Sequence, residues 1–435
     1  MVFLSLQNEK IYFNTLGRIS ENYFRLEDGT SGMVKQPYKK ITDENVLHWD
    51  GTHYHDIKEK GYDANKPARF AFFPLFSYIW KLSGISPSRV IFLNFFLFMG
   101  GLLLLAHVFK QKWENVLLIL ALPMTVIFLI PYTEATFFLM FSIAVWGYMK
   151  DRYWLYFIAM ILSSLSRNTI LLVFPAILCA ETLFFVKERQ IRQSLFRLMM
   201  GALPVLLGTA LMSFIQYKSG SGSVFKFIEV QKYWQNTFSL PDLTNLRDWS
   251  NESFAVNVPT MIMVGIPLII YLTSITLKQL NILKKHTSSF SFSSGNKSDY
   301  LNFVLLFCCL FALCSVLLFR HGSLHGLSRF VLCSPYFVIL LFLHQEKISS
   351  ISFVKRIVPF VILAIFSLFV LLLFSSFEFC YLGCFIFVGA MALYLFKYTK
   401  RELAYKISLV VISFVNIVWT TYLFNIYLCN GGLYT

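Results

Sequence analysis

Long apolar runs separated by short polar segments fill most of this 435-residue chain. Runs of about 17–22 residues can cross a hydrocarbon layer of roughly 30 Å as a helix. Backbone polar groups find no partner in lipid, so such runs must be helical. The pattern predicts an all-α, polytopic integral membrane protein with about twelve transmembrane helices, at 88–109, 114–130, 133–149, 153–166, 168–186, 195–215, 256–277, 300–319, 328–345, 357–375, 378–396 and 405–424.

Two polar regions interrupt this pattern. Residues 1–87 form an N-terminal region ahead of the predicted membrane domain at 88–424, and a long loop lies at 216–255. Within the N-terminal region, the aromatic-rich stretch Phe70–Leu82 is too short to span and predicts a helix lying at the membrane interface. The apolar stretch Val2–Leu6 is too short for a signal peptide.

Composition agrees with the membrane interpretation. Hydrophobic residues make up 57% of the chain and charged residues 14%, with a mean hydropathy of +0.62, which lies far from the values of soluble domains. The formal net charge of +15 would suggest a nucleic-acid partner for a soluble protein. Here the cations concentrate in short loops, where they indicate topology, and we expect no nucleic-acid partner. The eight cysteines predict buried apolar side chains, with neither a disulfide framework nor zinc-ligand spacing.

The distribution of Lys and Arg over the loops predicts an orientation. One side receives the basic loops, which we place in the cytoplasm: 110–112, 150–152, 187–197, 278–299, 346–356 and 397–406. The N-terminal region, the 216–255 loop and the C-terminus then lie on the other side. The N-terminal region carries many cations and nothing apolar precedes it to start its translocation. We therefore expect that an upstream helix is missing from this sequence.

Polar residues concentrate on the predicted external side, most densely between His48 and Tyr62. Asp50, His53, His55 and Asp56 fall within seven residues there. The histidines raise the possibility of a metal site, but their spacing matches no strong metal motif, so we expect no metal ligands. An ordinary surface loop, anchored at the lipid headgroups by Trp49 and Tyr54, is the alternative.

Three further polar groups follow on the same side. Glu134 begins a predicted helix, where the helix dipole alone would favour a carboxylate. Arg167 lies between two apolar runs, and such an arginine is costly unless it is paired or functional. His321 and Arg329 lie in a fourth group. Arg329 is either a site residue or an ordinary interfacial cation whose side chain extends toward the headgroups. Four groups on one face together favour a site that contains carboxylates, cations and aromatic rings.

These motifs resemble those of the PIG-V-type mannosyltransferases, a family with the GT-C fold. The run HWDGTHYHDIKEKGY, followed by AFFPLF, is similar to the first external loop of that family. The elements Tyr132-Thr133-Glu134, Ser166-Arg167-Asn168 and His321…Ser328-Arg329-Phe330 follow in the family's order. The first motif is fairly specific, and the others gain weight from their order over residues 48–340.

The resemblance implies an inverting glycosyltransferase that takes a sugar, which the family suggests is mannose, from a polyprenyl- or dolichyl-phosphate donor. The acceptor would be a glycolipid or another lipid-linked molecule in the same membrane. The reaction needs a base for the acceptor hydroxyl and cations for the leaving phosphate. The resemblance makes Asp50 the catalytic base, Arg167 and Arg329 the phosphate ligands, and assigns substrate binding also to Trp49, His53, Tyr54, Glu134 and His321. No cofactor is implied, although a divalent ion at the phosphate stays compatible with this chemistry.

The chain departs from the family in two respects. It lacks the helix that usually precedes the Trp-Asp loop, and its 216–255 loop is shorter than in eukaryotic members. The second difference favours a bacterial inner membrane with a periplasmic active site. The alternative is the endoplasmic reticulum with a luminal active site, which a glycan on Asn251-Glu252-Ser253 would support. A multi-pass transporter or lipid flippase is the competing functional class.

Overall fold

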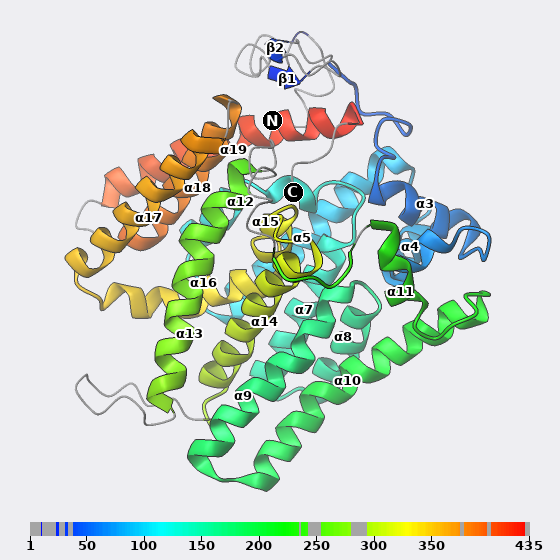
Figure 1. The fold of residues 1–435 in the computed structure, drawn as a ribbon, viewed down its shortest axis with the longest axis horizontal. Helices are drawn as coiled ribbons and strands as arrows, with labels where there is room; N and C mark the ends of the chain where they lie inside the picture. The colour runs from blue at the N-terminus through cyan, green and yellow to red at the C-terminus, as the bar shows by residue number, and fades with distance from the viewer. Residues whose placement is uncertain are drawn as a thin grey trace.

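The computed structural model describes residues 10, 23–25, 31–33, 38–234, 236–241, 254–279, 294–374, 378–397 and 402–430. The described chain is helical almost throughout (Figure 1). Its two strands, β1 (Tyr23–Arg25) and β2 (Ser31–Met33), pair antiparallel ahead of the helical body. The part of the predicted 216–255 loop at 242–253, which contains the glycosylation sequence at 251–253, lies outside the described residues.

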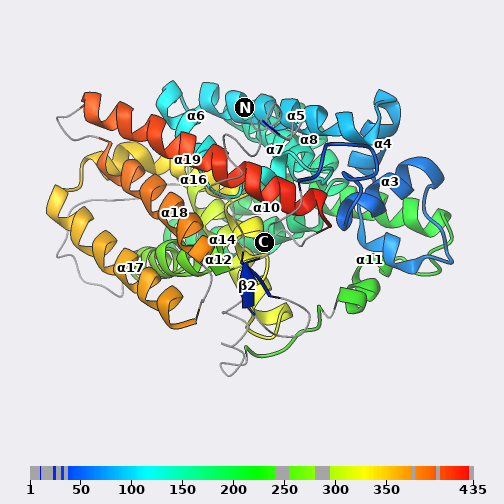
Figure 2. The ribbon, with the colours of Figure 1, turned by 90° about the horizontal axis from the view of Figure 1, so that it is seen from above.

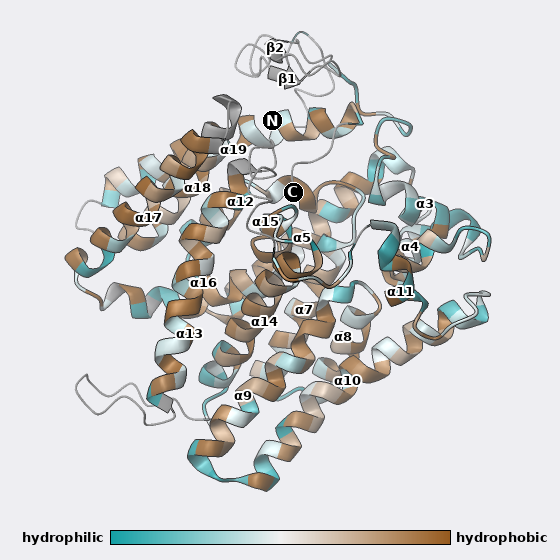
Figure 3. Ribbon diagram, in the orientation of Figure 1, coloured by the Kyte–Doolittle hydropathy of each residue, from teal (hydrophilic) through white to brown (hydrophobic). Residues whose placement is uncertain are grey.

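Seven helical segments are long and apolar enough, by length and composition, to cross a membrane: Pro87–Val108, Asn168–Glu188, Ile191–Lys218, Val256–Lys278, Lys297–Phe319, Phe353–Leu373 and Glu402–Leu428. Shorter apolar helices cover Glu134–Met149, Tyr153–Ser164, Pro335–Gln345 and Leu382–Phe396. The prediction of a helical, multi-pass membrane protein is thus confirmed. The hydrophobic colouring of these helices contrasts with the largely hydrophilic colouring of the N-terminal helix α3 (Figure 3).

The helices that hold the candidate site pack as neighbours in space. Helix α7 (Glu134–Met149) packs between α5 (Pro87–Val108) and α8 (Tyr153–Ser164). Helix α9 (Val173–Glu188), continuous with the 3-10 helix η4 (Asn168–Leu172), contacts α10 (Ile191–Lys218) and α14 (Lys297–Phe319). After α10 the chain continues through α11 (Lys226–Glu229), the 3-10 helix η5 (Val230–Trp234), α12 (Phe254–Thr260), a π-helical turn at Met261–Gly265 and α13 (Ile266–Gln279). Beyond α14 follow α15 (Leu327–Val331), α16 (Pro335–Ser349), α17 (Phe353–Phe374), α18 (Glu378–Phe396) and α19 (Glu402–Leu428).

The N-terminal region packs around its own small hydrophobic cluster. Helix α3 (Asp50–Lys60) is followed by the 3-10 helix η2 (Pro67–Ala71) and by α4 (Pro74–Ser83), and α3 packs on α4. Phe76 and Trp80 of α4 are fully buried, in one cluster with Tyr54 and Ile57 of α3. The stretch predicted as an interfacial helix is therefore a shorter helix that buries one face against protein.

The apolar run at 114–130 was expected to form one helix, and that expectation is wrong. Helix α6 (Trp113–Leu120) ends after eight residues, and a 3-10 helix, η3 (Thr125–Phe128), follows beyond Pro123. The break is enclosed by protein, because Ala121, Leu122 and Met124 are all buried. Irregular backbone at membrane depth is tolerated under that condition.

Side chains of α19 satisfy the carbonyl groups that the break leaves without helical partners. Asn416 donates from Nδ2 to the carbonyl oxygens of Leu120 and Leu122, at 2.9 and 3.1 Å. Trp419 donates from Nε1 to the carbonyl oxygen of Pro123 at 2.9 Å. These bonds explain why a broken segment is stable among apolar neighbours.

The run predicted at 328–345 is also divided, and the division positions part of the candidate site. Helix α15 ends at Val331, and α16 begins at Pro335 after Ser334, whose Oγ accepts from the amide of Phe337 at 3.3 Å. The amide of Ser328 donates to Oδ1 of Asn257 in α12 at 2.8 Å. This bond fixes the short helix that carries Arg329.

Candidate active site

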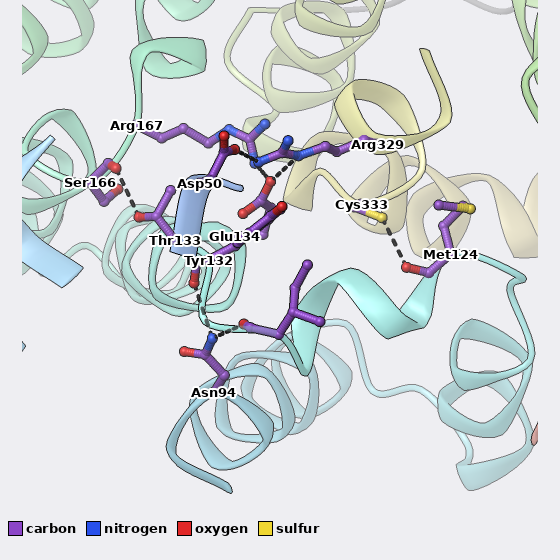
Figure 4. A network of polar contacts seen from close by, with 11 residues as sticks. Asp50, Asn94, Met124, Tyr132, Thr133, Glu134, Ser166, Arg167, Arg329 and Cys333 are labelled. Carbon is purple, nitrogen blue, oxygen red and sulfur yellow. Dashed lines mark hydrogen bonds and ion pairs between the residues drawn. The ribbon is translucent and has the colours of Figure 1, made fainter. Parts of the chain in front are cut away.

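Four charged residues from four separate segments meet at one end of the helices, and we call them the charged cluster: Asp50, Glu134, Arg167 and Arg329 (Figure 4). Arg329 donates from Nη2 to Oδ2 of Asp50 at 2.8 Å and from Nε to Oε1 of Glu134 at 2.5 Å. Arg167 Nη1 lies 2.5 Å from the same Oε1 atom. All four residues are candidates from the sequence, and the structure brings them together.

The local backbone explains how these side chains are presented. Asp50 and Glu134 are the first residues of α3 and α7, and Arg167 and Arg329 lie just before η4 and within α15. Two helix N-termini thus face the same region, and their dipoles favour negative charge there. The dipoles and the two guanidinium groups together favour an anion.

Glu134 is the buried centre of the charged cluster. Its side chain has no exposed surface, whereas Arg167 is 9% exposed, Arg329 17% and Asp50 26%. A buried carboxylate is stable only when it is paired, and here it binds two guanidinium groups through one oxygen. Its other oxygen, Oε2, has no hydrogen-bond partner among the described residues. The charged cluster therefore runs from a buried end at Glu134 to a partly open end at Asp50.

Aromatic rings hold the flat faces of both guanidinium groups. The Cζ atom of Arg329 lies 4.7 Å from the centroid of the Tyr132 ring, and that of Arg167 lies 5.2 Å from the Phe330 ring. Such cation–π contacts restrict each guanidinium to one plane and leave its edge for hydrogen bonding. The motif that contains Tyr132 did not predict its contact with Arg329.

Neighbouring hydrogen bonds fix the start of α7. Asn94 of α5 donates from Nδ2 to the carbonyl oxygens of Ile130 and Tyr132, the latter at 3.1 Å. Thr133 donates from Oγ1 to the carbonyl oxygen of Ser166 at 2.8 Å, and so joins the segments that carry Glu134 and Arg167. The sequence signal for this support was an Asn inside the apolar run at 88–109, and the structure shows that Asn94 is fully buried.

Close packing around position 51 explains why a glycine follows Asp50. An added Cβ would lie 2.8 Å from Cγ of Pro131 and 2.9 Å from the hydroxyl oxygen of Tyr427, both too close. The Tyr427 hydroxyl donates to the carbonyl oxygens of Val46 and His48, at 2.8 and 3.2 Å. The C-terminal end of α19 thus holds the loop before α3 against the start of α7.

Trp49 stands out by its backbone. It has φ of +49° and ψ of −130°, a conformation that a bulky residue rarely adopts, and its side chain is 54% exposed. Such strain persists where the surroundings impose it, often at functional sites. The strained residue has an exposed ring and directly precedes Asp50, the residue at the open end of the charged cluster.

The other predicted binding residues lie in different surroundings. His53 stacks on Phe72 with ring centroids 4.5 Å apart, and burial lowers its pKa although the Asp50 carboxylate opposes that shift. Tyr54 is buried in the hydrophobic cluster of α3 and α4, so its ring forms part of the packing there. His321, with φ of +53°, contacts Oγ1 of Thr237 through Nε2 at 3.2 Å. None of these contacts joins the charged cluster directly.

Asp56 proves to belong to a separate ion pair. Its carboxylate accepts from Nη2 of Arg69, whose side chain is only 2% exposed. Sequence reasoning missed Arg69, because nothing in the run of residues shows that η2 folds back onto α3. The pair joins these two elements. Of the two aspartates of α3, Asp50 alone belongs to the charged cluster.

Within the described ranges, no group of three or more His, Cys, Asp or Glu side chains is placed to hold a metal ion. The charged cluster presents a carboxylate at its open end beside two positioned guanidinium groups. The fold and this cluster define a multi-pass membrane protein with a charged site at one end of its helices. No family model, curated protein or solved structure matches the chain.

Proposed function

We propose that this chain is an inverting glycosyltransferase of the GT-C class, which moves a sugar from a polyprenyl- or dolichyl-phosphate donor to a lipid-linked or glycolipid acceptor. The observation that carries the proposal is the meeting of Asp50, Glu134, Arg167 and Arg329 from four distant segments. The same four residues stand in the motifs that resemble the PIG-V-type mannosyltransferases. Mannose is the sugar that this resemblance favours.

Asp50 is the proposed catalytic base. Its carboxylate accepts the proton of the acceptor hydroxyl while that oxygen forms a bond to the anomeric carbon of the sugar. The bond from the anomeric carbon to the phosphate oxygen breaks, and its electron pair leaves on the lipid phosphate. Attack from the face opposite the leaving group inverts the configuration. The partial exposure of Asp50, at 26%, gives a substrate access to this carboxylate.

Arg167 and Arg329 are the proposed ligands of the lipid phosphate. Their contacts within the charged cluster use Nη1 of Arg167 and Nε and Nη2 of Arg329, and each guanidinium carries further N–H donors. A guanidinium fork matches the oxygens of a phosphate and stabilises the charge that develops on it. Glu134, whose side chain has no exposed surface, holds both cations in place.

The same proposal includes twelve membrane crossings. Asn94, near the start of α5, donates to the backbone of residues 130 and 132. The broken segment therefore runs back along α5, from the C-terminal end of that helix to its N-terminal end. From Asn94 to Val108, α5 rises about 21 Å, and the broken segment covers the same depth. The charged cluster then faces the extracytoplasmic side, which we propose is the periplasm; the alternative is the lumen of the endoplasmic reticulum.

Sugar transfer by the purified protein tests the proposal. The protein is incubated with radiolabelled polyprenyl-phosphate mannose and a membrane extract, and the lipid products are separated. We expect label in a new lipid that requires the protein. A transporter would instead move label into sealed vesicles without forming a new covalent product, and that result would replace the transferase proposal.

A further inference from the structure

A groove of about 690 Å³ lies where the ends of α5 and α7 meet the start of α6. It is remote from the charged cluster, because Lys150 follows Glu134 by the sixteen residues of α7, which is about 24 Å along a helix. Figure 2 shows α5 and α6 side by side along one edge of the molecule. The volume is typical of a site for a small molecule, so the groove is large enough for an occupant of its own.

The walls of the groove are apolar and face outward. Leu103 of α5 and Val116, Leu117 and Leu120 of α6 line it. Leu103 is 54% exposed, and Trp113 at the mouth is 58% exposed. Exposed apolar walls of this size on a membrane protein fit an acyl chain.

The rim of the groove is cationic. Lys110 and Lys150 both line it and are both exposed. Within the part of the chain that the structure describes, no ion pair joins either lysine to a carboxylate. Lys112 and Arg152 lie within two residues of them and increase the positive charge. An anion at the rim would neutralise two cations, which follow the ends of two different helices, α5 and α7.

We propose that this groove binds one anionic glycerophospholipid, with its phosphate between Lys110 and Lys150 and an acyl chain along Leu103 and Leu120. A soluble anion would leave the apolar walls uncovered, and a neutral lipid would leave the two cations without a counter-charge. Basic pockets between membrane helices bind anionic headgroups by the same combination. The lipid would also cover the outer side of the broken segment.

Lipid retention measured by native mass spectrometry tests this site. The purified full chain is delipidated in detergent, and phosphatidylglycerol or phosphatidylcholine is added in equal amounts. The wild type is expected to retain one phosphatidylglycerol. Lys110→Ala combined with Lys150→Ala should weaken retention about thirtyfold, because each lysine near an anionic surface contributes about 1 kcal/mol. Leu103→Trp, which fills the groove, should weaken it without changing the charge.

Two controls sharpen the result. Lys355 on α17 is exposed and remote in sequence, so Lys355→Ala should retain lipid as the wild type does. Soluble glycerol phosphate at the same concentration should displace nothing. Wild-type retention by the double lysine variant, equal retention of phosphatidylcholine, or displacement by glycerol phosphate would each overturn the proposal. Thermal unfolding confirms that each variant is folded, which is expected because both lysines are exposed.

Discussion

Arg329 donates a hydrogen bond from Nη2 to Oδ2 of Asp50 at 2.8 Å, and so joins two residues that lie 279 positions apart in the chain. The same guanidinium donates from Nε to Glu134. Arg329 therefore connects the open and the buried ends of the charged cluster. Disturbance of either carboxylate is expected to reach the other through this side chain.

Arg167→Ala is expected to weaken use of the donor more than use of the acceptor. Loss of one charge-assisted contact to the lipid phosphate should raise the KM for polyprenyl-phosphate sugar about tenfold or more. Steady-state kinetics with each substrate varied in turn measures the difference. Arg152→Ala, which removes an exposed basic-loop cation, is the control and should change neither KM. Equal changes in both constants for Arg167→Ala would point to a structural role.

Glu134→Gln is expected to destabilise the protein strongly. The substitution removes the negative charge that holds Arg167 and Arg329 in a buried place, and breaking such a pair costs about 3–5 kcal/mol. The free energy of unfolding in detergent measures the loss. Glu59→Gln is the matched control, because Glu59 is half exposed and its ion pairs contribute little. Similar stability of the two variants would contradict the central position of Glu134.

Gly51→Ala is expected to lower stability by about 1–3 kcal/mol, because the new methyl group would overlap Pro131 and Tyr427. It should also reduce transfer by displacing the neighbouring Asp50. Unfolding and transfer assays together measure both effects. Gly100→Ala in α5 is the control, since the nearest atom outside its own helix would lie at an ordinary 3.8 Å. A fully stable and active Gly51→Ala would show that the loop relaxes without cost.

Asn416→Leu tests the support of the broken segment. The change leaves the carbonyl groups of Leu120 and Leu122 without their side-chain donor, at an expected cost of about 2 kcal/mol. Hydrogen exchange of the backbone at 121–128 should increase, as measured by mass spectrometry. Val410→Ala on an exposed position of the same helix should leave the exchange unchanged. Unaltered exchange in Asn416→Leu would mean that packing alone holds the break.

The sequence was sufficient to predict the helical membrane class and the members of the charged cluster. Charged groups are costly in an apolar chain, so Arg167 and Glu134 are conspicuous in the sequence alone. The break after α6 had one signal in the sequence, Pro123, since a proline inside a helical run ends or kinks the helix. What supports the break could not be predicted, because the donors Asn416 and Trp419 lie near the other end of the chain. The pairing of Asp56 with Arg69 was hidden for a similar reason, since it depends on how η2 packs on α3.

The most direct test compares Asp50→Asn with Asp56→Asn in transfer from radiolabelled polyprenyl-phosphate mannose. We expect Asp50→Asn to lower kcat at least about 100-fold while the protein stays folded, because an amide cannot accept the proton of the acceptor hydroxyl. Asp56→Asn should instead lower stability, since Arg69 then loses its partner, and its folded fraction should retain transfer. Substantial transfer by Asp50→Asn, with loss of transfer in folded Asp56→Asn, would contradict the proposed mechanism and assign the base to Asp56.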